Sequence, residues 1–156
     1  DRAADTFARL LQSAAPAEDP RYRVLEQLLT GPWQAAAWYK RPPKQYKLNP
    51  GQLRSVLTGY EGGDKVACIA SDRITVDGLP VGYLFREQPL DPNAPDSGWR
   101  IFAGDEDADY MADATHFDFF HLNTICNYDA SILALLNAPA PVAFRRAGDG
   151  WQQEER

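Results

Sequence analysis

The chain has 156 residues, a formal net charge of −6 and a sequence pI of about 4.8, which suits one domain with an N-terminal extension. Hydrophobic residues make up 44% and charged residues 24%, the composition of a folded globular chain rather than a disordered one. The acidic balance argues against nucleic acid as a direct partner, because phosphate binding needs clustered Lys and Arg, and it favours a basic protein surface instead.

The first 65 residues are predicted to form a helical N-terminal extension packed on a main domain of residues 66–156. Apolar residues recur at helical spacing over residues 2–14, and Asp19-Pro20 is a typical helix start. Asn49-Pro50 predicts a third helix, whose apolar stripe would be Leu53, Val56, Leu57 and Tyr60. The basic run between them, residues 40–47, contains two prolines and is predicted to be an extended loop rather than a nucleic-acid site.

From residue 65 onward the pattern changes from helix to strand. An Asp-Gly turn inside residues 73–86 predicts a hairpin, and Gly148-Asp149-Gly150 predicts another near the C-terminus. Single strands are predicted over residues 65–70, 98–103 and 117–122. Short helices are predicted over residues 105–114 and after Asp129, whose side chain would cap the second of them. The predicted fold class is α+β: a mainly antiparallel sheet with two short helices, preceded by a helical N-terminal third.

The two cysteines, Cys68 and Cys126, both lie among apolar residues and are predicted to be buried and unpaired. That state is typical of a cytoplasmic protein. The sequence begins at Asp1 rather than Met, so a processed start and a periplasmic location remain open. No apolar run reaches the length of a transmembrane helix, so we expect no membrane partner.

The densest group of charges in the chain follows the predicted strand at residues 98–103. Five of the nine residues from Asp105 to Asp113 are acidic. The group is either a set of solvated helix caps, placed where the helix dipole favours negative charge, or a surface for a basic protein partner. Asp105, Asp107 and Asp109 alternate as in a calcium loop, but Tyr110 and His116 stand where that loop needs Gly and Glu. We therefore expect no metal and no cofactor.

Neither histidine has a recognisable catalytic setting. His116 and His121 are five residues apart, which places them on opposite faces of a strand. Either could act as a general base beside a carboxylate, although a histidine bonded to the backbone is the more common case. Motifs of nucleophilic hydrolases and nucleotide-binding proteins are absent, so no catalytic residue is assigned. Trp99 is predicted to belong to the core.

Several blocks, in this order, resemble the DUF2185 family, also described as an Imm33-type immunity protein domain. The resemblance spans about residues 66–152. Its blocks are Ile69-Ala70-Ser71-Asp72-Arg73-Ile74, Val81-Gly82-Tyr83-Leu84-Phe85-Arg86-Glu87, Asp96-Ser97-Gly98-Trp99-Arg100-Ile101-Phe102-Ala103-Gly104-Asp105-Glu106, Asn127-Tyr128-Asp129 with Ile132 and Leu136, and Pro141-Val142-Ala143-Phe144-Arg145-Arg146.

The resemblance implies a bacterial immunity protein, without enzymatic activity or cofactor, that binds and neutralises a cognate toxin of a polymorphic-toxin or type VI secretion system. A nuclease toxin with a basic cleft would suit an acidic inhibitor. A small hydrolase using a His and carboxylate pair, and an adaptor that binds a secreted partner without inhibiting it, are the alternatives. The sequence leaves monomer and homodimer both open. The expected partner-binding residues are Asp105, Glu106, Asp107, Asp109, Tyr110 and Asp113.

Overall fold

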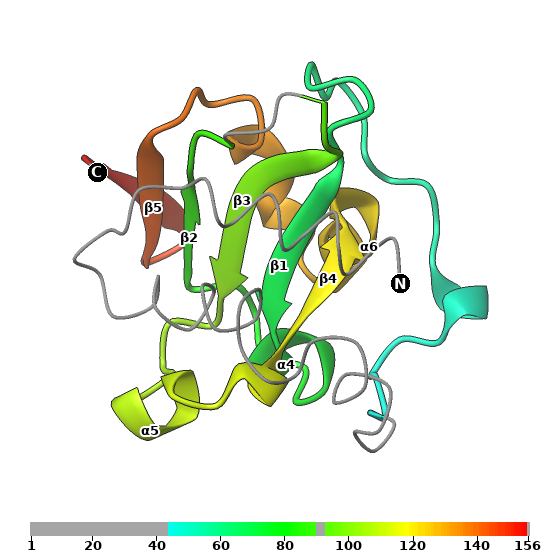
Figure 1. Cartoon of the computed structure of the whole chain (residues 1–156), viewed down its shortest axis with the longest axis vertical. Helices are drawn as coiled ribbons and strands as arrows, with labels where there is room; N and C mark the ends of the chain where they lie inside the picture. The colour runs from blue at the N-terminus through cyan, green and yellow to red at the C-terminus, as the bar shows by residue number, and fades with distance from the viewer. Residues whose placement is uncertain (1–43, 90–92, 156) are drawn as a thin grey trace.

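The computed structural model describes residues 44–89 and 93–155 (Figure 1). The helices predicted within residues 2–14 and after Asp19 lie outside the described residues, as does most of the predicted N-terminal extension. Within the described part the fold is a mixed six-stranded sheet with a few short helices. None of these helices is long and apolar enough to cross a membrane.

The sheet is built from strands in the order β4-β1-β3-β2-β5-β6. Strands β1 and β3, the second and third in this order, run parallel, and the other neighbouring strands are antiparallel. The expectation of a mainly antiparallel sheet therefore holds for every neighbouring pair except β1 and β3, which make the sheet mixed. The strands are β1 Ala67–Ser71, β2 Tyr83–Arg86, β3 Asp96–Phe102, β4 Phe117–His121, β5 Val142–Ala147 and β6 Gly150–Glu154.

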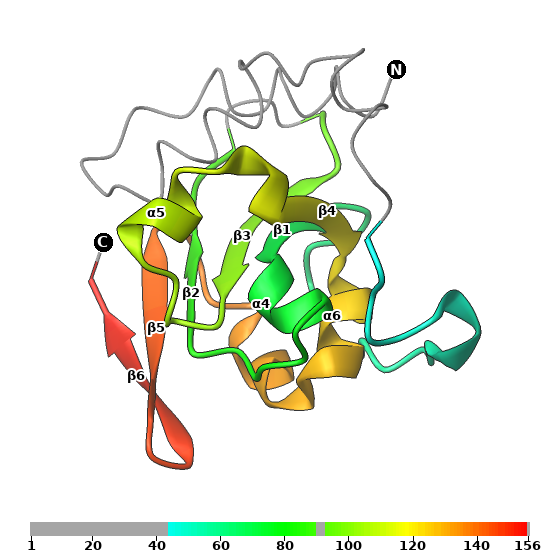
Figure 2. The ribbon, with the colours of Figure 1, turned by 90° about the horizontal axis from the view of Figure 1, so that it is seen from below.

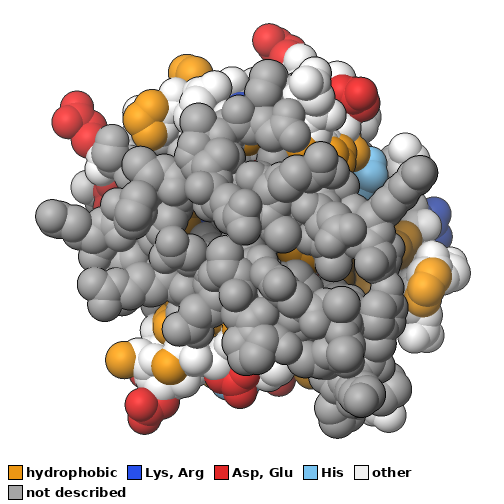
Figure 3. Space-filling model, in the orientation of Figure 1, with side chains coloured by type: hydrophobic (Ala, Val, Ile, Leu, Met, Phe, Trp, Pro, Cys, Tyr) orange, Lys and Arg blue, Asp and Glu red, His pale blue; other side chains and the backbone are white. Residues whose placement is uncertain are grey.

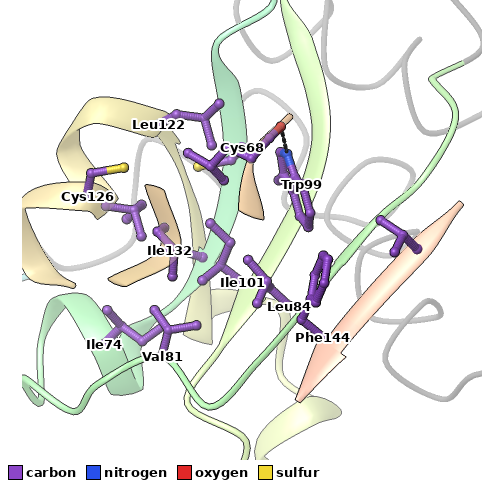
Figure 4. Close-up of a cluster of buried hydrophobic side chains, with 14 residues drawn as sticks. Cys68, Ile74, Val81, Leu84, Trp99, Ile101, Leu122, Cys126, Ile132 and Phe144 are labelled. Carbon is purple, nitrogen blue, oxygen red and sulfur yellow. Dashed lines mark hydrogen bonds between the residues drawn. The ribbon is translucent and has the colours of Figure 1, made fainter. Parts of the chain in front are cut away.

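Alternating side chains along these strands divide the core between the two faces of the sheet. One face carries an aromatic cluster that includes Phe85, Phe102 and Phe117, all buried. The other face carries a larger cluster that surrounds Trp99 (Figure 4). Trp99 is fully buried, and its indole N–H donates to the carbonyl of Leu136 at 3.1 Å. The prediction that Trp99 belongs to the core is confirmed.

The short helices lie on both sides of the sheet. Figure 2 shows α4 (Asp72–Thr75) and α6 (Leu122–Tyr128) on one side, and α5 (Ala108–Met111) on the other. The remaining helical turns are of the 3-10 type: η1 Pro50–Gln52, η2 Ala114–His116 and η3 Ala130–Leu135. Asp129 caps η3, as the sequence predicts for the helix after it, although that helix is 3-10 rather than α.

Two predicted elements are wrong, and one helix was not predicted. The helix predicted after Asn49-Pro50 is only the single turn η1, and residues 53–58 are neither helix nor strand. The first strand of the hairpin predicted in residues 73–86 is instead α4, because the Ser71 side chain accepts from the N–H of Arg73 and begins a helix. Helix α6 follows β4 directly, where the sequence predicted only a strand.

The C-terminal hairpin and the state of the two cysteines agree with the predictions made from the sequence. Strands β5 and β6 pair from Ala143 opposite Glu154 to Ala147 opposite Gly150, which confirms the predicted hairpin. Cys68 and Cys126 are both free and buried. Burial raises the pKa of the Cys126 thiol to about 11, and it raises that of Cys68 further, so both side chains act as small apolar groups.

Asp129 joins three parts of the domain through one carboxylate. Its Oδ2 accepts from the Val81 N–H at 2.9 Å and from Arg146 Nη2 at 2.6 Å. Its Oδ1 accepts from the N–H and hydroxyl of Ser131 at 3.1 and 2.6 Å. Burial alone would raise the pKa of Asp129, but hydrogen bonds from Ser131 and Val81 outweigh it and hold the pKa below the ordinary 3.8.

This depressed pKa makes part of the stability dependent on pH. A carboxyl whose pKa is lower in the folded state stabilises the fold above its unfolded pKa of 3.8, and the contribution is lost as pH falls through the folded pKa. We expect Asp129→Asn to lower the free energy of unfolding by about 2 kcal/mol at pH 7 and by clearly less at pH 3. Urea unfolding of both proteins at the two pH values measures this. An equal difference at both values would contradict it.

Candidate functional site

The residues predicted to bind a partner lie together after β3 and around α5. We call this group the acidic surface; it consists of Asp105, Glu106, Asp107, Asp109, Tyr110 and Asp113. Four of its five carboxylates are exposed, and the fifth, that of Glu106, is partly buried. Carboxylate groups are visible at the lower edge of the molecule in Figure 3, where Figure 1 places α5.

Three of these carboxylates, those of Glu106, Asp107 and Asp113, accept hydrogen bonds from nearby backbone N–H groups. Glu106 accepts from the N–H groups of Ala103 and Gly104 at 2.9 and 2.8 Å, which closes the turn after β3. Asp107 is the N-cap of α5 and accepts from the Tyr110 N–H at 2.8 Å. The helix caps considered for this segment are therefore present, and their side chains are held in fixed positions.

Asp113 holds the start of the next helical turn, η2, in the same way. It is the N-cap of η2, and its Oδ1 accepts from the N–H and the hydroxyl of Thr115 at 2.9 and 2.6 Å. The hydrogen bond from the Thr115 side chain is the main reason why the pKa of Asp113 lies below its usual value. Asp113 therefore stays ionised over the whole physiological range.

Asp105 pairs with an arginine that is distant in sequence. Arg73, on α4, donates from Nε at 3.2 Å and from Nη2 at 2.5 Å to the two oxygens of Asp105. The same guanidinium donates from Nη1 to Asp77 at 2.9 Å. Hydrogen bonding to Arg73 lowers the pKa of Asp105. One cation thus holds two exposed carboxylates and ties the acidic surface to α4.

Asp109 differs from its neighbours. It is exposed on the first turn of α5, and no hydrogen bond or ion pair of its side chain is recorded among the described residues. Among the described residues, the other four carboxylates of the acidic surface bind backbone or side-chain groups of the domain, and that of Asp109 does not. A cationic side chain of a partner could pair with it without breaking an existing contact.

Tyr110 supplies an aromatic side chain at the centre of the acidic surface. Its ring stacks on that of His116, with centroids 3.9 Å apart and planes at 20°. His116 Nδ1 lies 2.7 Å from the Tyr110 carbonyl oxygen, so this nitrogen carries the proton and donates. Burial raises the pKa of Tyr110 to about 12, so its hydroxyl stays neutral at physiological pH. A half-buried, fixed tyrosine is a typical anchor of protein interfaces.

These residues surround an open hollow of about 390 Å³. Its walls are Arg73, Asp105, Glu106, Asp107, Asp109, Tyr110 and His116. Carboxylates outnumber the single arginine, so the hollow suits a cationic side chain. No group of three or more His, Cys, Asp or Glu residues in the described chain is arranged to hold a metal ion.

The two histidines do not form a common site. His121 is the N-cap of α6, and its Nδ1 accepts from the Asn123 N–H at 2.9 Å. His116 lies in the hollow, with its Nε2 3.6 Å from Asp113. The sequence predicts the acidic residues as a contact surface but gives no sign of Arg73, which lies 32 residues before Asp105 and is predicted to belong to a hairpin strand. No local signal indicates that contact, because it depends on how α4 packs.

One family model, described as the Immunity protein Imm33 domain, matches residues 68–155. The match covers more than half of the chain and includes the whole sheet apart from Ala67, the first residue of β1. It confirms the resemblance that the sequence blocks indicate. No curated protein and no solved structure gave a significant match to the chain.

Proposed function

The chain belongs to the Imm33 immunity protein domain family, and on that basis we propose that it binds a cognate bacterial toxin and neutralises it by covering the active site. The family establishes an immunity role in general. The finer proposal is that the toxin is an effector of a type VI secretion or polymorphic-toxin system, and that the acidic surface contacts it.

The observation that carries the proposal is the fixed position of three carboxylates of the acidic surface, two of them exposed and that of Glu106 partly buried. Glu106 and Asp107 are held by backbone N–H groups and Asp105 by Arg73, so their charges are placed before a partner arrives. Fixed side chains lose little conformational freedom on binding, which favours affinity. A surface of this kind is complementary to the basic cleft of a nuclease, and we propose a nuclease as the target.

Two kinds of interaction would share the binding. The carboxylates would attract a basic surface over a distance and so raise the association rate. Tyr110, half-buried against His116, would then be the aromatic anchor that keeps the complex together. We place the protein in the cytoplasm, where the toxin would act, and the two unpaired buried thiols support that location.

Co-expression with the product of the neighbouring toxin gene tests this function. We expect the chain to restore growth of cells that produce the toxin, and to copurify with it. Restored growth also distinguishes immunity from a non-inhibitory adaptor, which would copurify without protecting the cell. If the chain neither protects nor copurifies, the proposal fails.

A small hydrolase is the second candidate, because His116 and Asp113 lie near each other at the hollow. The 3.6 Å separation exceeds a hydrogen bond, and the described residues that line the hollow include no serine, threonine or cysteine. The amount of chain needed distinguishes the two functions: an inhibitor needs one chain for each toxin molecule, whereas an enzyme would abolish toxin activity at far less than one chain per toxin molecule.

A further inference from the structure

A segment without regular secondary structure, residues 53–61, lies along the side of the domain formed by α6 and the end of η3 (Figures 1 and 2). Among the described residues, every hydrogen bond recorded for the main chain of residues 54–61 goes to a side-chain amide. The amides belong to Asn123 and Asn127 on α6 and to Asn137 just after η3. None of the six strands of the described sheet pairs with this segment.

The two asparagines of α6 bind the first half of the segment. Asn127 accepts from the Arg54 N–H at 2.9 Å and donates to the Arg54 carbonyl at 2.9 Å. Asn123 donates to the same carbonyl at 2.8 Å and accepts from the N–H groups of Val56 and Leu57 at 2.7 and 2.9 Å. Four residues apart on a helix, the two side chains lie on one face.

Asn137 binds the second half in the same way. It donates to the Gly59 carbonyl at 2.7 Å and accepts from the Glu61 N–H at 2.8 Å. A side-chain amide has the same donor and acceptor groups as a peptide bond, so it can pair with any main chain whatever its side chains are. The three asparagines therefore recognise a peptide backbone, much as an adjoining strand would.

Apolar contacts accompany these hydrogen bonds. Val56, Leu57 and Tyr60 are partly buried and pack against the core cluster on the α6 side of the sheet. The Tyr60 hydroxyl also donates to the Lys65 carbonyl at 2.6 Å. Backbone pairing together with pockets for a few side chains is how proteins bind extended peptides.

The asparagines and the segment that they bind lie on opposite sides of the boundary of the family match. All three asparagines lie within the matched residues 68–155, and residues 53–61 lie outside them. We propose that the α6–η3 side of the domain is a peptide-binding groove that this chain fills with its own residues 53–61. Its ligand is a non-helical segment with two adjacent aliphatic residues and an aromatic residue three positions later. This proposal goes beyond the immunity function and does not depend on the acidic surface.

The test is exchange of the internal segment for a free peptide of the same sequence. The probe is a fluorescent synthetic peptide of residues 51–62, and binding to the full chain is measured by anisotropy. In the unaltered chain the tethered segment competes at high effective concentration, so the free peptide binds weakly. In a variant with Val56→Ala and Leu57→Ala the competitor is weakened, and we expect at least tenfold tighter apparent binding.

Two controls make the result specific. Addition of Asn123→Ala to the weakened variant should abolish peptide binding, whereas Gln153→Ala, which removes an exposed amide on β6, should leave it unchanged. A peptide of the same composition in scrambled order should not bind. A folded weakened variant that does not bind the peptide would overturn the proposal, and so would binding that survives the loss of Asn123.

Hydrogen exchange on the unaltered chain provides a second measurement if the weakened variant does not fold. The amides of Arg54, Val56, Leu57 and Glu61 should exchange together, and at least tenfold faster than those of β1 and β3, because the segment leaves the groove without unfolding of the sheet. Protection equal to that of the sheet would show that the segment is an inseparable part of the core, and would overturn the proposal.

Discussion

Replacement of Asp96 by Asn is expected to lower the free energy of unfolding by about 3–5 kcal/mol, because it leaves a buried arginine without its main counter-charge. Arg100 is 1% exposed. Its Nη1 and Nη2 donate to the two oxygens of Asp96 at 2.8 and 2.7 Å, and its Nε donates to Glu87 at 3.0 Å. Burial alone would lower the pKa of Arg100, but Asp96 and Glu87 more than compensate, and the side chain stays charged.

Asp96 also shapes the start of β3. Its Oδ1 accepts from the N–H of Gly98 at 2.9 Å. Gly98 has φ of 87°, and a Cβ there would lie 2.1 Å from the Glu87 carbonyl oxygen, so this position requires glycine. The amide of an Asn at position 96 can replace one acceptor but not the charge.

Denaturant unfolding at pH 7 measures the effect of Asp96→Asn. Asp77→Asn is the matched control, because Asp77 also pairs with an arginine but is 43% exposed, and exposed pairs contribute little. We expect the control to change the free energy of unfolding by less than about 0.5 kcal/mol. A similar small change for Asp96→Asn would contradict the role assigned to the buried pair.

Neutralisation of the acidic surface is expected to slow association with the toxin about 10- to 100-fold at low ionic strength, with little change in stability. The variant combines Asp105→Asn, Glu106→Gln, Asp107→Asn and Asp109→Asn. Asn keeps an acceptor oxygen and is a good N-cap, so the start of α5 should survive. A Gln at position 106 can accept from only one of the two N–H groups of Ala103 and Gly104, so the turn after β3 keeps one of its two side-chain hydrogen bonds, and denaturant unfolding of the variant checks that the fold is retained. Reversal of the same charges with Lys would remove these acceptors and confuse misfolding with lost attraction.

Association rates at two salt concentrations measure this effect. The control variant carries the same change in net charge at exposed positions outside the acidic surface: Glu61→Gln, Asp64→Asn, Asp149→Asn and Glu155→Gln. We expect the control to retain most of the rate and of its salt dependence. Equal rates for the two variants would show that the toxin approaches another part of the chain.

The sequence indicates the sheet better than it indicates the segments that pack on it. Strands β1 and β3 follow from short apolar runs, and the C-terminal hairpin follows from its turn residues. The apolar spacing of Val56, Leu57 and Tyr60 suggested a helix, yet these residues contact the core from an irregular segment. The N–H groups of Val56 and Leu57 both donate to Asn123, which lies 67 and 66 residues later, so no local pattern could reveal these contacts.

In the acidic surface, too, the local sequence predicts some features, and others depend on tertiary contacts. The sequence predicts one helix over residues 105–114 with acidic residues at its start, and Asp107 is the N-cap of α5. Asp113, near the predicted end of that helix, is instead the N-cap of the separate turn η2. The ion pair between Arg73 and Asp105 was not predictable, because β-branched residues and an Asp-Gly turn made residues 73–86 resemble a hairpin. The fixed geometry of the surface therefore emerges only from the tertiary structure.

The most direct test of the immunity function is a titration of the cognate toxin's activity with the purified chain. We expect activity to fall linearly and to vanish at one chain per toxin molecule, as complete occlusion of an active site requires. The complex should form more slowly with the neutralised variant. Full toxin activity in the presence of an excess of folded chain would contradict the account.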